Sequence, residues 1–80
     1  MFLTIHSLKK TLFDGEVLSI NCVTESGEIT ILDKHQPLIS RLVPGTITVV
    51  DSDKKEHFIP VSGGFLEIQP NNRTRFIIEE

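Results

Sequence analysis

Residues 62–72 of this 80-residue chain read Ser62-Gly63-Gly64-Phe65-Leu66-Glu67-Ile68-Gln69-Pro70-Asn71-Asn72. At the centre of this stretch the apolar Leu66 and Ile68 are separated by the charged Glu67. Successive side chains of a strand point to opposite faces of a sheet, so a period of two indicates a strand with one buried face. Glycine, proline and asparagine, which favour turns, bound the segment at both ends. The stretch therefore predicts one short strand between two tight turns.

The same period of two recurs along most of the chain. It is clearest in residues 2–5, 17–22 and 46–49. In the second of these segments we expect Leu18, Ile20 and Cys22 to share one face, with Cys22 as a small buried apolar residue. No sustained 3.6-residue apolar stripe is present. The nearest candidate, around residues 37–42, is predicted to be a short turn-like segment bounded by Pro37 and Pro44.

Turn signals separate these segments at short intervals. They are Asp14-Gly15, Ser26-Gly27, Pro44-Gly45, the polar run 51–55, Ser62-Gly63-Gly64 and Pro70-Asn71-Asn72. Many short strands with turns at this spacing indicate a single all-β domain, a sandwich or a barrel. We expect antiparallel pairing because the connections are too short for parallel crossovers. Pro60 interrupts an apolar run and cannot donate a ladder hydrogen bond, which predicts an edge strand or a bulge there.

Composition excludes several classes of function. The chain has 8 Lys and Arg against 11 Asp and Glu, a formal net charge of −3. Nucleic-acid binding needs clustered cations, so we expect no nucleic-acid partner. No apolar run approaches the roughly 20 residues of a membrane span, and the N-terminal residues do not resemble a signal peptide. A single cysteine permits no internal disulfide, and we expect a reducing cytosolic environment.

No catalytic or cofactor-binding pattern is apparent. His6, His35 and His57 are far apart and lack partners at metal-ligand spacing. Gly63-Gly64 is not followed by the Lys-Ser/Thr pair and helix of a phosphate-binding loop. We therefore expect no metal and no cofactor. The residues alone predict a binding or structural module, and a stand-alone sandwich that binds a ligand or a protein is an alternative.

Five strings resemble, in order and at matching spacing, segments of the epsilon subunit of rotary (F-type) ATP synthases. They are Phe13–Val17 (F-x-G-x-V in the family), Ser26–Ile31 (E-G-E-hydrophobic-G-I), His35–Ser40 (H-A-P-L-L-T), Leu42–Gly45 (K-P-G) and Ser62–Asn72 (S-G-G-F-x-E-V-Q-P-N-x). The last string is the most specific. Together they cover nearly all of the chain.

The resemblance implies a β-sandwich of about ten short strands, with the two sheets packed face to face. It also implies a non-catalytic rotor subunit at the foot of the central stalk. Such a subunit binds the gamma subunit and the polar loops of the c-ring, contacts the alpha/beta core indirectly, and couples proton or sodium flow to ATP synthesis. It is peripheral on the cytoplasmic face of the membrane. With no basic amphipathic helix in the sequence, we expect no direct lipid binding.

Site residues follow from the resemblance position by position. Glu28 aligns with an acidic residue that faces the c-ring loops, which carry basic and polar groups. His35 aligns with a histidine near the gamma and c-ring contacts. Ser7 and Ser40 align with small polar positions near gamma. Two leucines, Leu38 and Leu42, are either apolar contacts in that interface or core residues, and core is the favoured interpretation.

Two departures from the family pattern carry expectations. The family usually has glycine at the positions of Thr30 and Lys34 and proline at that of Asp33. A positive φ is costly for Thr or Lys, so we expect the loop that holds His35 to differ in shape. Residues 1–80 match the sandwich alone and hold no counterpart of the helical hairpin that follows it in the family. We therefore expect neither helix-based inhibition nor ATP sensing.

Overall fold

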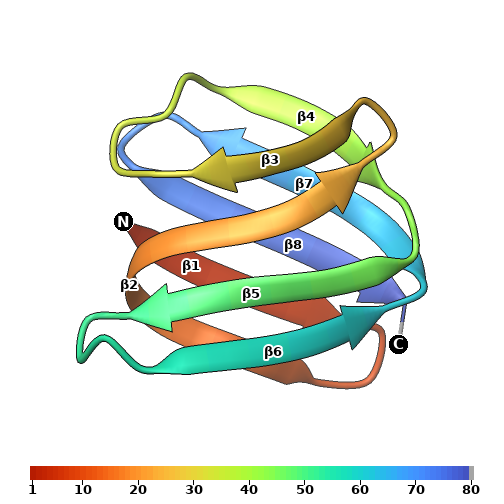
Figure 1. The fold of residues 1–80 in the computed structure, drawn as a ribbon, viewed down its shortest axis with the longest axis horizontal. Coiled ribbons are helices and arrows are strands. Elements are labelled where there is room, and N and C mark those ends of the chain that lie inside the picture. Colours follow the sequence, from red (N-terminus) through yellow and green to blue (C-terminus); the bar gives the residue numbers. More distant parts are fainter. Residues whose placement is uncertain (80) are drawn as a thin grey trace.

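Eight strands joined by short connections form most of the computed structural model, which describes residues 1–79 (Figure 1). In chain order they are β1 (Phe2–Ser7), β2 (Thr11–Thr24), β3 (Gly27–Ile31), β4 (Leu38–Leu42), β5 (Gly45–Asp51), β6 (Glu56–Val61), β7 (Gly63–Gln69) and β8 (Arg73–Glu79). These described residues contain no helix able to cross a membrane. The expected number of strands, about ten, is too high by comparison, partly because the 14 residues of β2 run through both layers as one strand.

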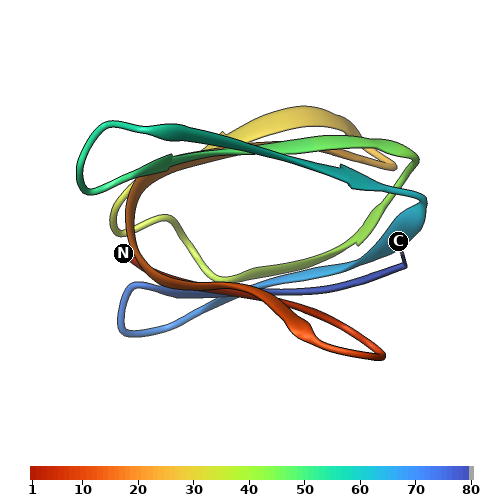
Figure 2. The same ribbon diagram turned by 90° about the horizontal axis from the view of Figure 1, so that it is seen from below.

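The strands form the two layers of a sandwich, seen edge-on in Figure 2. The first half of β2 pairs with β1, and its second half pairs with β3 and β5. One layer therefore contains β1, β8, β7 and β4, and the other contains β3, β5 and β6, with β2 shared between them. We call these the β8 layer and the β5 layer. The all-β sandwich predicted from the sequence is confirmed.

The first and last strands lie side by side in parallel, with Phe2 opposite Arg73 and Ser7 opposite Ile78. The other pairings among the described strands are antiparallel, as predicted. The prediction rested on short connections, and that argument applies only to strands joined directly by one connection. β1 and β8 are separated by the rest of the chain, so the argument does not apply to them. They are free to pair in parallel, contrary to the prediction of antiparallel pairing.

The core lies between the two layers and follows the predicted alternation with one exception. Its fully buried members include Leu3, Ile5, Ile20, Cys22, Ile31, Ile47, Val49, Leu66, Phe76 and Ile78. Burial raises the pKa of the Cys22 thiol to about 11, so it is an inert apolar group at neutral pH, as expected. Leu18, however, is 45% exposed, and Val17 is buried in its place. The register shifts between Val17 and Ser19, and this bulge reverses the alternation before Ile20.

The segment after Pro37 is a strand and not the predicted turn. β4 pairs along its length with β7, from Leu38 opposite Ile68 to Leu42 opposite Gly64. The adjacent apolar residues Leu38 and Ile39 concealed its alternation. Two further local predictions are confirmed: Pro60 lies in the edge strand β6, and residues 51–55 form the tip of the β5–β6 hairpin. The turn predicted at Asp14-Gly15 is wrong, because both residues lie inside β2 and pair with β1.

The Ser62-Gly63-Gly64 turn carries the chain from the β5 layer into the β8 layer. Gly64 has φ = 136°, and a Cβ atom there would lie 2.2 Å from the carbonyl oxygen of Ile77. Only glycine permits this close approach of β7 to β8. The predicted change of direction is present, but Ser62 alone separates β6 from β7, and Gly63 and Gly64 are the first residues of β7. The second of these glycines has a steric reason.

Candidate functional site

The outer face of the β8 layer carries an apolar patch that no strand among residues 1–79 covers. Ile39 of β4, Phe65 of β7 and Ile77 of β8 are 73%, 52% and 46% exposed. Phe65 lies opposite Ile77, and the residue opposite Ile39 is Glu67, two positions along β7 from Phe65. These three side chains, with Glu67 and Arg75, line a shallow hollow of about 270 Å³. We call Ile39, Phe65 and Ile77 the apolar patch.

None of the patch residues was among the residues singled out from the sequence. The signal was present, because each patch residue has an apolar neighbour that faces the core or the open end of the sandwich. Phe65 precedes the buried Leu66, and Ile77 precedes the buried Ile78. Strands with apolar side chains on both faces are normally covered on both sides. Here the outer side is exposed, which indicates an interaction surface.

Two of the predicted contact residues, Ser7 and Glu28, lie at one end of the sandwich, in different layers (Figure 1). Ser7 closes the β1–β2 hairpin, because its hydroxyl oxygen accepts hydrogen bonds from the backbone N–H groups of Lys9 and Lys10 at 3.2 and 3.3 Å. Glu28 is exposed on β3, opposite Val23. The structure therefore gives Ser7 a local role and leaves the Glu28 carboxylate available.

The turn before Glu28 is fixed by a buried threonine. The Thr24 hydroxyl donates to the Gly27 carbonyl oxygen at 2.9 Å and accepts from the Ser26 N–H at 3.1 Å. Thr24 is 4% exposed, so these bonds are shielded from competing water. Gly27, with φ = 119°, completes a turn that fixes where β3 and its carboxylate begin.

His35 lies at the opposite end of the sandwich, in the β3–β4 loop, and is exposed. Its Nδ1 lies 2.8 Å from the carbonyl oxygen of Gln36, so the ring is oriented by its own loop. Ser7 and Glu28 thus do not converge with His35 on one site.

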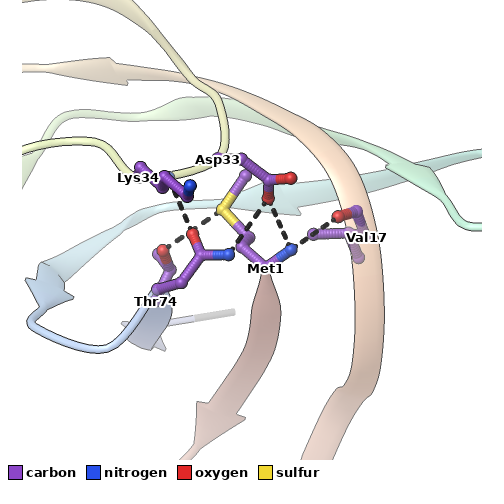
Figure 3. Close-up of polar contacts among 6 residues, drawn as sticks. Met1, Val17, Asp33, Lys34 and Thr74 are labelled. Carbon is purple, nitrogen blue, oxygen red and sulfur yellow. Dashed lines mark hydrogen bonds and ion pairs between the residues drawn. The ribbon is translucent and has the colours of Figure 1, made fainter.

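Polar contacts with the N-terminus and with the β7–β8 turn fasten that loop (Figure 3). The Asp33 carboxylate lies 2.7 Å from the Met1 ammonium group and accepts a hydrogen bond of 3.3 Å from the Asn72 amide. These two contacts, the first the stronger, lower the pKa of Asp33. Lys34 has φ = 63°, and its N–H donates to Asn72 Oδ1 at 2.8 Å. Lys34 therefore adopts the left-handed conformation expected of the family's glycine, and Thr30 lies within β3.

The β4 candidates differ in burial. Leu42 is 3% exposed and belongs to the core, as favoured from the sequence. Leu38 was also expected in the core, but it is 39% exposed, because its inward side chain lies at the open end of the sandwich. It lines a hollow of about 380 Å³ with Pro37 and Pro70. Ser40 is half-buried between the two leucines on the same row.

Comparison with known proteins identifies the family. Residues 1–76 match the family described as ATP synthase, Delta/Epsilon chain, beta-sandwich domain. The chain belongs to this family. The resemblance stated from the sequence strings is thereby confirmed.

Curated relatives of the delta/epsilon family support this membership. The chain is 42% identical over 72 residues to the ATP synthase epsilon chain of Delftia acidovorans, covering 85% of this chain and 52% of that protein. It is 44% identical over 75 residues to the ATP synthase epsilon chain of Bordetella avium, covering 89% and 53% respectively. The chain thus spans about half the length of these relatives.

Solved structures show the same sandwich. A chain in the Euglena gracilis mitochondrial ATP synthase, in a structure of OSCP, F1 and c-ring, superposes with a TM-score of 0.90 at 25% identity, over 98% of this chain and 49% of that chain. A chain in the central stalk and c-ring structure of the Tetrahymena thermophila mitochondrial ATP synthase superposes with a TM-score of 0.83 at 17% identity. It covers 100% of this chain and 63% of that one, and this second likeness concerns the fold alone.

Proposed function

We propose that this chain is a non-catalytic rotor subunit of a rotary ATP synthase. In this proposal it joins the central stalk, binds the gamma subunit and the polar loops of the c-ring, and couples proton or sodium flow to ATP synthesis. Its place is peripheral, on the cytoplasmic face of the membrane, through protein contacts. The observation that carries the proposal is the apolar patch on a sandwich of the delta/epsilon family.

The apolar patch is the surface that we assign to gamma. Three large apolar side chains gathered over three adjacent strands form a contiguous exposed surface, which in soluble proteins marks an interaction site. A rim of charged groups, among them Glu67 and Arg75, surrounds it. An apolar centre with a polar rim is the ordinary composition of a protein–protein interface.

The end of the sandwich that carries Glu28 is the surface that we assign to the c-ring loops. Glu28 is exposed, and its turn is fixed by Thr24, so the carboxylate is presented at a defined place. A carboxylate there complements loops that carry basic groups, as the family resemblance implies. Ser7, which the resemblance implies lies near gamma, is at the same end but in the β8 layer, the layer whose outer face we assign to gamma. His35, at the other end, then belongs to the gamma side together with Leu38 and Ser40.

A capture experiment tests the function and the gamma surface together. The purified chain serves as bait for detergent-solubilised membranes of its own organism, and captured proteins are read by mass spectrometry. We expect gamma, alpha, beta and c subunits. Phe65→Ser should abolish the capture, whereas Phe58→Ser should not, because Phe58 is 63% exposed on the other layer and serves as a matched control.

Each outcome of the capture experiment has a distinct meaning. If the wild-type chain captures no synthase subunit from membranes that contain the intact enzyme, the proposed function is wrong, and a stand-alone binding module takes its place. If Phe58→Ser abolishes capture and Phe65→Ser does not, the gamma surface lies on the β5 layer.

Charge reversal tests the c-ring assignment. Glu28→Lys should leave stability within about 0.5 kcal/mol of wild type, since the site is exposed. It should, however, reduce ATP-driven ion pumping in reconstituted synthase. Glu56→Lys, an exposed glutamate at the start of β6, is the matched control. Equal pumping by both variants at the wild-type level would remove Glu28 from the coupling surface.

A further inference from the structure

The two kinds of basic residue occupy different parts of the molecule. All three arginines, Arg41, Arg73 and Arg75, lie on strands of the β8 layer. The five lysines lie between strands, at Lys9, Lys10, Lys34, Lys54 and Lys55. Arginine is enriched and lysine depleted at protein interfaces, because a planar guanidinium pairs with carboxylates through two donors and stacks on rings. This segregation marks the arginine-bearing surface as an interface.

The three arginines point outward around the apolar patch. They alternate with buried residues of their own strands: Leu42 follows Arg41, and Thr74 and Phe76 flank Arg75. Arg41 lies opposite Phe65 on β7, Arg75 lies opposite Glu67, and Arg73 lies opposite both Gln69 and the Phe2 of β1. We call the apolar patch together with these arginines the arginine face.

Only one of these guanidinium groups has a carboxylate partner among residues 1–79. Arg75 Nη2 lies 2.6 Å from Glu67 Oε1. The other two arginines stack on aromatic rings, Arg41 at 5.7 Å from the centre of Phe65 and Arg73 at 5.1 Å from that of Phe2. Stacking holds a guanidinium in place while the N–H donors along its edge stay free. Two oriented cations, Arg41 beside the patch and Arg73 farther along β8, therefore have no counter-charge in the described part of the chain.

Beside Arg73 the surface has a hollow that suits a carboxylate. It measures about 230 Å³, lies over β1 and β8, and is lined by Thr4 and Gln69 as well as by Arg73 and Arg75. Its lining is almost entirely polar. Arg75 lines both this hollow and the one over the patch, whereas Arg73 is four residues from Ile77 on the same strand, so the Arg73 end of the hollow lies about 13 Å from Ile77.

We propose that the partner segment covering the apolar patch bears carboxylates that bind Arg41 and Arg73. The partner is the gamma subunit of the proposed function, on which this inference rests. In this proposal the gamma segment that covers the patch has an apolar side chain that packs against Phe65 and Ile77. One acidic side chain reaches Arg41 beside that contact, and another lies about 13 Å away over Arg73. Because the chain as a whole carries a net charge of −3, these cations favour one docking register over others.

Charge reversal of the two stacked arginines tests the inference. Binding of the full chain to gamma is measured by surface plasmon resonance at low and high salt for Arg41→Glu, Arg73→Glu and the control Lys55→Glu. Each arginine variant should raise Kd at least tenfold at low salt and flatten the salt dependence, since one attractive pair becomes repulsive. Lys55→Glu, an equal change of charge on a hairpin tip, should change Kd less than twofold.

Thermal unfolding of each variant controls for loss of fold. If an Arg→Glu variant is unstable, Arg→Gln at the same position removes the charge and should still raise Kd. The decisive experiment is a rescue, in which single Asp→Lys or Glu→Lys changes in gamma are screened against Arg73→Glu. One of these changes should restore binding to Arg73→Glu while weakening binding to the wild type.

The outcomes separate the two proposals. If gamma binds the wild type and fails to bind Phe65→Ser, but binds both Arg→Glu variants as it binds Lys55→Glu, the inference is wrong and the proposed function stands. If gamma does not bind the wild type at all, both are wrong.

Discussion

Asp51 fixes the β5–β6 hairpin with a single carboxylate. Its Oδ1 accepts hydrogen bonds from the N–H groups of Asp53 and Lys55 at 2.8 and 3.0 Å, and its Oδ2 lies 2.7 Å from His57 Nε2. The bond with His57, followed by the backbone bonds, lowers the pKa of Asp51. A carboxyl whose pKa is lower in the folded state stabilises the protein above its unfolded pKa, about 4, and this stabilisation disappears as pH falls through the folded pKa.

Asp51→Asn should therefore lower the melting temperature at neutral pH, and its effect should shrink as the pH falls below about 4. Thermal unfolding of both proteins across this range measures the difference. Asp53→Asn, in the same hairpin, is the control and should show little effect at any pH. A loss at Asp51 that is as large at about pH 2.5 as at neutral pH would show that the ionised carboxylate is not its cause.

Gly64 offers a second residue-level prediction. Ala at this position would place a Cβ atom 2.2 Å from the Ile77 carbonyl oxygen at φ = 136°. We expect Gly64→Ala to destabilise the fold by roughly 3 kcal/mol, the upper range for backbone strain. Gly63→Ala is the control, because its Cβ would meet nothing closer than 3.9 Å. Denaturant unfolding that gives equal losses for both variants would contradict the steric argument.

Among the described strands, β6 is one of the two edges of the β5 layer, β3 being the other, and it contains Pro60. Proline has no N–H to offer an approaching strand, so it protects an edge against pairing with another molecule. Pro60→Thr should keep the fold and increase self-association at high concentration, measured by sedimentation. Pro44→Thr, the same substitution in the β4–β5 turn, should stay monomeric. Equal behaviour of the two variants would exclude edge protection by Pro60.

How far the elements could be predicted depended on whether their signals were local. The strand Gly63–Gln69 and its flanking turns were predictable, because alternation and glycine act within a few residues. Leu18 was misplaced because a bulge changes the phase of the alternation, and nothing in its neighbours announces that extra residue. Strand β4 was missed because two successive apolar residues, Leu38 and Ile39, conceal the alternation. Leu38 lies at the open end of the sandwich, and Ile39 lies on the uncovered outer face.

For the molecule as a whole, the pairing of Phe2 with Arg73 brings together residues from both ends of the described chain. Contacts so distant in sequence must close long loops before they contribute to stability, which slows folding. We expect the main refolding phase in stopped-flow circular dichroism to fall between about a millisecond and a second. A microsecond main phase would mean that local contacts, rather than this closure, limit the rate.

The same long-range pairing explains why the arginine face was not predicted from the sequence. Arg41 and Arg73 are distant in sequence, and only the register of β4, β7 and β8 brings both onto the outer face of one layer. Glu28 and His35, by contrast, came from aligned strings, and their partner contacts remain predictions. Sequence strings thus pointed to single positions, whereas the surface they belong to required the assembled layers.

The parallel arrangement of β1 and β8 also bears on how the molecule resists force. Tension applied between Phe2 and Glu79 pulls the two strands along their length in opposite directions. In this shear geometry the ladder bonds from Phe2–Arg73 to Ser7–Ile78 share the load together instead of opening one at a time. A sandwich closed in this way is stiff along the axis that joins Phe2 and Glu79, a mechanical property that would suit the rotor function proposed above.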